Sequence, residues 1–503
     1  MDEEGFVDYA RALNELSSEG VTAEQNALPL LFQAWGPPNR EPEVNQKYFE
    51  LIGTAVPPPE PYSIVKSGDQ VRVVRADDSP YFIGFHAFLE RKGFLFERFP
   101  HGHGLLDESA DGEDGEWAAW DKVLSTVTRE PWGAADHPAA AAWLDANARP
   151  LELLVQASSK PRMFSPLISN GSFWNELNPQ SEAFESMSRA LAARAMLALG
   201  ERNWHAAASD LETLHRLAAL AAQGASSSAG LQLSQKAFQL DRHLASLAPE
   251  DVRAGYRRVV EAMPSFPDPG QQIDTVERLA TLSMVCGAAR AGTTRIGYLA
   301  AVSGQVPKTP VSLIDWNYAL SQVNAWYDRA EAAFRQPTRS TRRSALDSVL
   351  TEIELFEQHA SQGRALRHWL RPRRELGERV AQQWVYLYAA GWANLLHQFD
   401  RADTERELTR LVFALHGHRD DQGRFPERLD ELVPRYLTAV PLDPFSDSPF
   451  HYRAEKAGQG FVLYSVGWNE QDDSGREREG NSKEDDIVVR YPTDLEAPAT
   501  DGE

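Results

Sequence analysis

The chain has 503 residues, of which 51 are basic and 73 acidic, and its formal net charge is −22. A phosphate-binding surface needs clustered Lys and Arg, so this balance argues against a nucleic-acid partner. The length allows roughly two or three domains with sizeable cores, and the single cysteine, Cys286, excludes an intrachain disulfide.

The start of the chain predicts an amphipathic helix, because four apolar side chains recur at helical spacing: Phe6, Tyr9, Ala10 and Leu13. No apolar run reaches the length of a membrane-spanning helix, and no signal peptide precedes Asp2. The protein is therefore expected either in the cytoplasm or in a compartment that it reaches with a leader outside this sequence.

Residues 1–154 predict a mixed, mostly helical region with a proline-rich break near Pro59. Residues 62–65 and 70–75 alternate as expected for a small hairpin. Several short motifs punctuate the helices: Asn14, Trp35-Gly36-Pro37, Pro131-Trp132, His137-Pro138 and Trp143-Leu144. Together they are similar to a family of large planctomycete proteins. Such proteins commonly have an N-terminal membrane anchor, so the resemblance implies a possible anchor that is absent from this sequence, and it implies no activity.

Residues 155–398 predict an α-helical domain. Apolar stripes over Met187–Leu199 and Trp204–Leu220 predict a helical hairpin. Further helices are expected after four capping or proline signals: Pro249, Pro269, Val311 and Thr338. Because no repeat of fixed length is sustained, an irregular helical bundle or solenoid is expected. The many aromatic rings are expected to fill its core; the alternative is an aromatic groove for a peptide or glycan.

A separate α+β domain is predicted over residues 399–503. Leu408, Leu411 and Leu415 lie on one apolar stripe of an amphipathic helix. Pro426 is then expected to begin a second, short helix, since its missing N–H would be unsatisfied there in any residue.

Strands follow this helical part. Pro441 and Pro444 bracket Asp443 in a rigid turn in which no β-ladder is expected. Three strands are then predicted, at residues 450–454, 461–466 and 487–491. Both faces of the second strand are apolar, so it needs cover on more than one side.

The loop between the last two strands, residues 467–486, concentrates acidic and amide side chains. Its candidate metal ligands are four carboxylates: Asp472, Asp473, Asp485 and Asp486. Calcium uses hard oxygen ligands of this kind, completed by amides and backbone carbonyls. The spacing is not that of an EF-hand, and a solvated acidic loop without a metal is the alternative interpretation.

The order of motifs in this part of the chain is distinctive. It reads Asp-x-Gly-Arg-Phe-Pro, Leu-x-x-Leu-Val-Pro, Val-Pro-x-Asp-Pro-Phe, Tyr-Ser-Val-Gly, an acidic loop and Asp-Ile. This order closely resembles the soluble domain of the major pseudopilins of type II secretion. In that family the loop before the terminal strand binds a structural calcium ion. The resemblance therefore implies calcium held by Asp472 or Asp473 and by Asp485 or Asp486, and it implies an extracytoplasmic, periplasmic location.

The resemblance spans Asp403 to about Pro492 only. A pseudopilin begins with a very hydrophobic helix that packs into a filament, whereas here the domain follows a long chain, so assembly into a pilus is not expected. The loop also carries the insertion Arg476–Glu479 relative to the simplest family pattern. Which of the carboxylates coordinate the ion therefore stays open.

Catalytic motifs for a nucleophilic serine, a zinc protease or a phosphate loop do not occur. His416 and His418 point about 200° apart on a helix and cannot share an ion without help. The pseudopilin resemblance places an aromatic side chain at His416, which implies a packing role. The basic runs Arg339–Arg343 and Arg371–Arg374 are best explained as solvated helix ends.

The sequence thus predicts a mainly α protein: an irregular helical bundle or solenoid body with a small C-terminal α+β pseudopilin-like domain, a helix plus a three-stranded antiparallel sheet. The expected function is that of a non-enzymatic scaffold or interaction protein with a calcium-stabilised module and an unknown protein or peptide partner. The alternative is a hydrolase or other enzyme with a site between the N-terminal region and the helical domain. A cleft of converging polar groups with shifted pKa values would favour that alternative.

Overall fold

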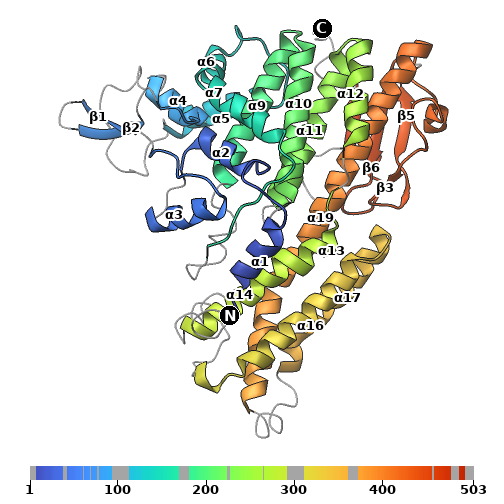
Figure 1. The fold of residues 1–503 in the computed structure, drawn as a ribbon. Helices are drawn as coiled ribbons and strands as arrows, with labels where there is room; N and C mark the ends of the chain where they lie inside the picture. Colours follow the sequence, from blue (N-terminus) through green and yellow to red (C-terminus); the bar gives the residue numbers. More distant parts are fainter. Residues whose placement is uncertain are drawn as a thin grey trace.

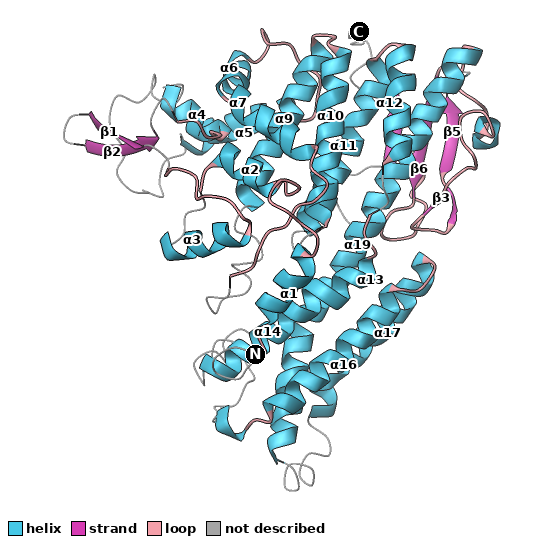
Figure 2. Ribbon diagram, in the orientation of Figure 1, coloured by secondary structure: helices cyan, strands magenta, loops and turns pink. Residues whose placement is uncertain are grey.

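The computed structural model describes the following parts of the chain: residues 7–37, 42–59, 62–67, 70–75, 79–92, 113–168, 181–223, 227–263, 266–291, 311–360, 372–455, 458–476 and 486–492. Within them the protein is mainly helical, with a small three-stranded antiparallel sheet near the C-terminus (Figure 2). The predicted fold class is confirmed at this level. Among these residues no helix combines the length and the apolar character needed to cross a bilayer.

The N-terminal part consists of short helices and one small hairpin. The helices are α1 Tyr9–Ser18, α2 Leu28–Trp35, α3 Pro42–Leu51, α4 Phe85–Lys92, α5 Glu113–Val127, α6 Pro138–Ala146 and α7 Ala148–Ser158. In α1, Ala10 and Leu13 are buried, as the amphipathic pattern predicts. The strands β1 (Tyr62–Ser67) and β2 (Gln70–Arg75) pair antiparallel, which confirms the predicted hairpin.

The centre of the molecule is a group of long helices that lie side by side in Figure 1: α9 Ser181–Gly200, α10 Trp204–Ala222, α11 Ser227–Leu247 and α12 Glu250–Ala262. The first two form the predicted helical hairpin. Gly200 ends α9, and a Cβ on it would lie 2.1 Å from the carbonyl oxygen of Trp132. Only glycine at position 200 therefore allows the end of α9 to lie so close to the backbone of Trp132.

A second group of helices extends away from the centre: α13 Pro269–Gln272, the π-helix η1 Ile273–Glu277, α14 Arg278–Ala291, the 3-10 helix η2 Val311–Leu313, α16 Trp316–Phe334 and α17 Arg339–Ala360. We call the hairpin of α16 and α17 the arm. Tyr327, Trp384 and Trp392 are buried where the arm packs against α19, so these rings fill a core as expected. Trp369 lies outside the described residues.

The helix α19, Pro372–Gln422, has 51 residues and connects all of these parts. At 1.5 Å per residue it is about 76 Å long. Its residues up to Ala402 pack in the core of the arm, whereas Leu408–Leu415 pack in the core shared by the N-terminal part, the central helices and the C-terminal sheet. The predicted boundary between residues 398 and 399 falls inside this continuous helix.

The C-terminal module, residues 408–492, combines the end of α19 with a 3-10 helix and five strands. These are η3 Leu429–Leu432, β3 Leu442–Asp443, β4 Ser448–Pro449, β5 His451–Glu455, β6 Gly460–Ser465 and β7 Ile487–Tyr491. The sheet order is β5-β6-β7, all antiparallel. Every residue of the central strand β6 is buried, in agreement with its two apolar faces. The second helix is a single 3-10 turn that starts at Leu429 and not at Pro426.

The prediction that no β-ladder runs between the two prolines was also wrong. Between Pro441 and Pro444 a short ladder does run, because Leu442 pairs with Pro449 and Asp443 with Ser448. The carboxylate of Asp443 makes this turn possible, since it is fully buried and accepts hydrogen bonds from neighbouring N–H and hydroxyl groups. These bonds fasten the turn to the end of β6.

Candidate functional site

The acidic loop leaves the end of β6 and returns at β7, and the structure describes its residues 467–476 and Asp486. Asp472 accepts a hydrogen bond from the Tyr464 hydroxyl over 2.9 Å and another from the Ser474 N–H over 2.8 Å. The Ser474 N–H is the main reason that the pKa of Asp472 lies below its ordinary value. Asp472 therefore carries a negative charge at neutral pH.

Asp473 and Asp486 lie beside it. Asn469 Nδ2 donates to Asp473 Oδ2 over 2.9 Å, and the Gly475 N–H donates to Asp486 Oδ2 over 2.7 Å. Asp486 is only 4% exposed. Burial raises its pKa, the N–H groups of Gly475 and Asp473 oppose the shift, and the charges of Asp473 and Asp472 raise it further. Three of the four predicted ligands are thus close enough to act on one another.

The chemistry of these side chains suits calcium, because carboxylates and backbone carbonyls are its preferred ligands. Asp485 lies outside the described residues. Within the described part of the chain, no group of three or more His, Cys, Asp or Glu side chains has the geometry of a metal site. In the structure, Asp486 accepts hydrogen bonds from N–H groups of the loop, and Asp472 accepts from the Ser474 N–H and from the Tyr464 hydroxyl of β6. The predicted ligand set therefore stays a prediction.

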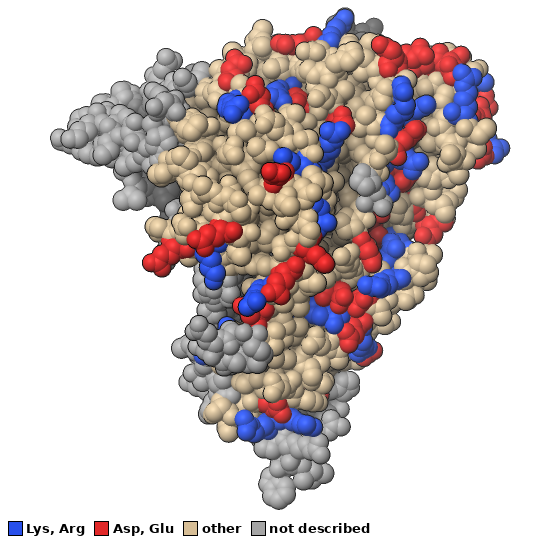
Figure 3. Space-filling view, viewed as in Figure 1, with Lys and Arg blue, Asp and Glu red and all other residues tan. Residues whose placement is uncertain are grey.

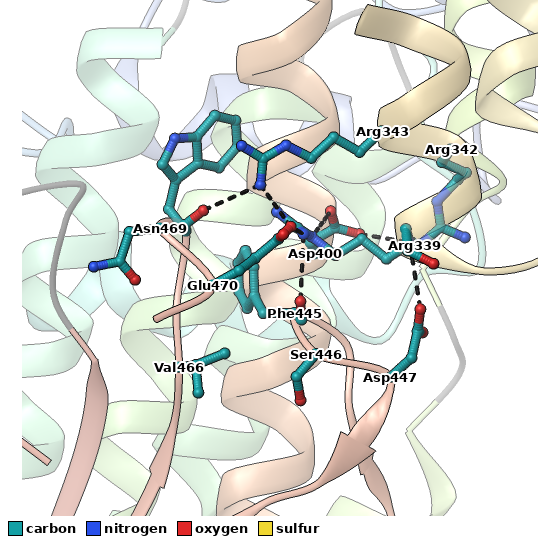
Figure 4. A network of polar contacts seen from close by, with 12 residues as sticks. Arg339, Arg342, Arg343, Asp400, Phe445, Ser446, Asp447, Val466, Asn469 and Glu470 are labelled. Carbon is teal, nitrogen blue, oxygen red and sulfur yellow. Dashed lines mark hydrogen bonds and ion pairs between the residues drawn. The ribbon is translucent and has the colours of Figure 1, made fainter. Parts of the chain in front are cut away.

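Next to the acidic loop lies a cluster that the sequence did not predict. We call Arg339, Arg342 and Arg343, in the first turns of α17, the arginine clamp. Arg339 Nε donates to Asp400 Oδ2 over 2.9 Å, and Arg342 donates to the other oxygen of that carboxylate over 3.1 Å. Arg339 and Arg343 both bind Oε1 of Glu470. The arm, α19 and the acidic loop therefore meet at one group of charges (Figure 4).

The centre of the clamp is buried. The side chains of Arg339 and Asp400 are only 2% and 3% exposed. The guanidinium of Arg339 lies over the ring of Phe445 at 4.4 Å and near the ring of Trp468 at 5.9 Å. Burial raises the pKa of Asp400 to about 6, and Arg339 and Arg342 oppose that shift. The ionised form of Asp400 thus depends on both arginines.

The clamp corrects the expectation that the basic run 339–343 is a solvated helix end, because Arg339 is buried. One signal was available in the sequence. Arginines at positions i, i+3 and i+4 share one helix face, which indicates a common partner. The partners themselves, Asp400 and Glu470, lie 61 and 131 positions away from Arg339 and could not be identified by spacing. Arg374, in the other basic run, is 56% exposed and fits the expectation.

A shallow groove of about 660 Å³ runs along the arm beside the clamp. It is lined by Ser340, Arg343, Ser344, Asp347, Ser348, Thr351 and Glu470. The charges in it have both signs, and Figure 3 shows the same intermixing of Lys and Arg with Asp and Glu over the face of the molecule in view. The groove therefore does not select one sign of ligand charge.

His416 and His418 of α19 do not share a site: His418 Nδ1 lies 3.0 Å from the carbonyl oxygen of Arg424, whereas His416 packs among aromatic rings. His416 is 1% exposed and packs edge-on against the rings of Phe425 and Tyr491. Burial, aided by the nearby charges of Arg253 and Arg419, lowers the pKa of His416 to about 3. A neutral imidazole in an aromatic cluster is the packing role that the resemblance implied.

A buried chain of hydrogen bonds joins α10, α11 and α12. His215 Nε2 lies 2.9 Å from Asp241 Oδ2, and the Tyr256 hydroxyl donates to Asp241 Oδ1 over 2.8 Å. These residue types occur in catalytic relays, but each of the three residues is less than a tenth exposed. Here they hold three helices together.

The buried polar contacts within the N-terminal part are also structural in the residues that the structure describes. Asn26 Nδ2 donates to the carbonyl of Phe164 over 3.0 Å. Asn147 Oδ1 accepts from the N–H of Ile83 over 2.8 Å, and Trp143 Nε1 donates to the Ile83 carbonyl over 2.8 Å. These side chains satisfy buried backbone groups, and the enzyme alternative stays a prediction.

Comparison of the chain with protein-family models, with curated proteins and with solved structures found no match.

Proposed function

We propose that the protein is a non-enzymatic scaffold or interaction protein whose C-terminal module is pseudopilin-like and stabilised by calcium. The observation that carries the proposal is the gathering of Asp472, Asp473 and Asp486 in one loop that is held at both ends. Neighbouring carboxylates repel one another, and a bound divalent cation offsets that repulsion.

The surrounding module supports the pseudopilin comparison. The end of α19 packs against a three-stranded antiparallel sheet, and the acidic loop comes directly before the terminal strand β7. His416 occupies an aromatic packing position. These features agree with the motif order on which the resemblance rests.

The helical body supports a scaffold role, because ion pairs with a buried carboxylate join neighbouring helices. Arg194 pairs with Asp210 through two hydrogen bonds between α9 and α10, at 2.9 and 2.6 Å. Arg242 of α11 pairs with Glu405 of α19, whose side chain is 1% exposed. Such pairs fix how helices are placed relative to one another. The partner would be a protein or peptide bound on this rigid, irregular bundle or solenoid.

The ion site is tested on the full chain by thermal unfolding after removal of metal. Extracellular calcium modules bind with Kd values of about 10⁻⁴ to 10⁻³ M, so millimolar calcium is the useful range. We expect calcium to raise the Tm by about 2 °C or more relative to chelator, by mass action on the folded state. Hydrogen exchange should place the added protection in the acidic loop.

The matched variants are Asp473→Asn with Asp486→Asn, and Asp430→Asn as control. Asp430 is an exposed carboxylate of the same module that pairs with Arg428. The double variant should lose most of the response to calcium, and the control should keep it. Identical melting curves in calcium and in chelator, or an equal response to magnesium, would remove the ion from the proposal.

A further inference from the structure

We infer that the arginine clamp couples the order of the acidic loop to the position of the arm. The inference concerns the loop of the proposed ion site and gives that proposed function a means of regulation. The contacts that carry it do not involve the ion. A change in the acidic loop is expected to alter the order of the first turns of α17, and a change in those turns is expected to alter the order of the loop.

Glu470 is the connecting residue. It belongs to the acidic loop, and Oε1 of its carboxylate is bound by Arg339 and Arg343 of the arm (Figure 4). Arg343 also lies 3.4 Å from the carbonyl oxygen of Trp468 and over its ring at 5.5 Å. The carboxylate of Asp447, in the β3–β4 turn, adds a contact to the Ser340 N–H in the first turn of α17. The tip of the arm is therefore fastened to two loops of the module.

The backbone of Glu470 shows that these contacts hold the loop in place. Its φ is +57°, a left-handed conformation that residues other than glycine seldom adopt. Such a conformation persists where surrounding contacts over-determine it. Here they are the two arginines on the side chain and the carbonyl of Gly467, which accepts from the Glu470 N–H over 3.3 Å. Without the two arginines, fewer contacts hold Glu470 in the left-handed conformation.

From Glu470 the order passes to the acidic residues through short contacts. The Gln471 N–H donates to Asn469 Oδ1 over 2.9 Å, and Asn469 Nδ2 donates to Asp473. The Asp473 N–H lies 3.4 Å from Asp486 Oδ1. A change in the backbone at Glu470 therefore alters the placement of the carboxylates that follow it.

At the other end, the clamp is anchored on α19. Arg339 and Arg342 both bind the carboxylate of Asp400, and Arg339 also binds Glu470. The first turn of α17 is therefore attached both to α19 and to the acidic loop. Coupling between two sites is reciprocal in free energy. Whatever orders the acidic loop must therefore steady the tip of the arm by the same factor, and the reverse also holds.

The test is amide hydrogen exchange on the full-length protein without added metal, comparing wild type with Arg343→Met. The side chain of Arg343 is 36% exposed, so the variant is expected to fold. The reporters are the N–H groups of Ser474 and Gly475, which are bonded to Asp472 and Asp486. We expect roughly fivefold or faster exchange at both, within the usual range for coupled sites.

The matched control is Arg329→Met. Arg329 also lies on the arm and pairs with an exposed carboxylate, that of Glu352, outside the clamp. It should leave Ser474 and Gly475 unchanged. If Arg343→Met leaves both amides within twofold of wild type, the loop and the arm are not coupled and the inference is wrong.

The reverse direction uses Asp486→Asn, with the N–H groups of Arg342 and Arg343 as reporters. Loosening the loop should speed their exchange, and unchanged exchange there would contradict reciprocity. The same hydrogen-exchange measurement is repeated separately on wild type with calcium added. If calcium alters neither loop nor arm while the variants behave as expected, the ion site fails and the coupling stands.

Discussion

The C-terminal module is held on two sides by different physical means. On one side, Leu408, Leu411 and Leu415 of α19 pack with Phe461 of β6 in a continuous apolar core. On the other side, the arginine clamp joins the module to the arm through ion pairs. Apolar burial contributes about 25 cal/mol per Å² in any orientation, whereas a buried ion pair roughly recovers the cost of desolvation only in one geometry.

The apolar side provides most of the stability of the module, and the clamp side sets how the arm is placed. The apolar side explains why the module folds against α19, since its leucines are essentially without exposure. The clamp side explains the position of the arm. Arg339 of α17 binds Asp400 of α19 and Glu470 of the acidic loop, so it reaches both partners only when these three segments lie together.

The largest effect is expected for Leu411→Asp on the apolar side. Leu411 has 0% exposure, and an unpaired carboxylate there has no hydrogen-bond partner to replace water. We expect a loss of roughly 4 kcal/mol in the free energy of unfolding, measured by urea denaturation. Leu442→Asp is the control, because Leu442 is 56% exposed in the same module. Equal stability of the two variants would contradict the apolar side as described.

A smaller loss is expected for Arg339→Met on the clamp side. Removing one partner of a buried pair leaves Asp400 with Arg342 alone, which should cost roughly 3 kcal/mol. Arg424→Met is the control, since Arg424 is 53% exposed and pairs with exposed Glu427. The loss should be measured by urea denaturation, and hydrogen exchange should localise it to α17 and the acidic loop. A loss spread evenly over the module would mean that the clamp is part of the core.

The smallest effect is a gain, expected for His416→Phe at acid pH. The folded pKa of His416 is about 3 against 6.5 for an ordinary histidine, so the unfolded chain binds a proton first as pH falls. Stability from this group is therefore present above pH 6.5 and is lost progressively down to about pH 3. At pH 5 the variant should retain about 2 kcal/mol that wild type has lost relative to pH 7.5.

The measurement for His416→Phe is the free energy of unfolding between pH 8 and pH 4.5, in both proteins. His205→Phe is the control, because His205 lies on the surface at the start of α10. Phenylalanine also removes the His416 Nε2 atom, which has no hydrogen-bond partner within the described residues. Parallel pH profiles for wild type and His416→Phe would show that this histidine does not set the acid sensitivity of the module.

Much of the local structure followed from patterns that act over short distances. Helical periodicity located α9, α10 and the end of α19, and strand-forming residues bounded by turn signals located β6 and β7 within a residue or so. Local chemistry also failed in places. Asp443 permits a short ladder between prolines because its buried carboxylate binds the end of β6, and Pro426 precedes a 3-10 turn where a helix was expected.

In the candidate site, too, local sequence signals determined some features and tertiary packing decided the others. The sequence by itself determined the mainly helical character, the C-terminal sheet and the position of the acidic loop, because periodicity, proline and strand-end signals are local. The tertiary structure decided that Arg339 is buried, that Asp400 and Glu470 are its partners, and that α19 runs unbroken between two cores. These outcomes depend on residues 61 and 131 positions apart that meet only after packing, and no spacing along the chain encodes such a meeting.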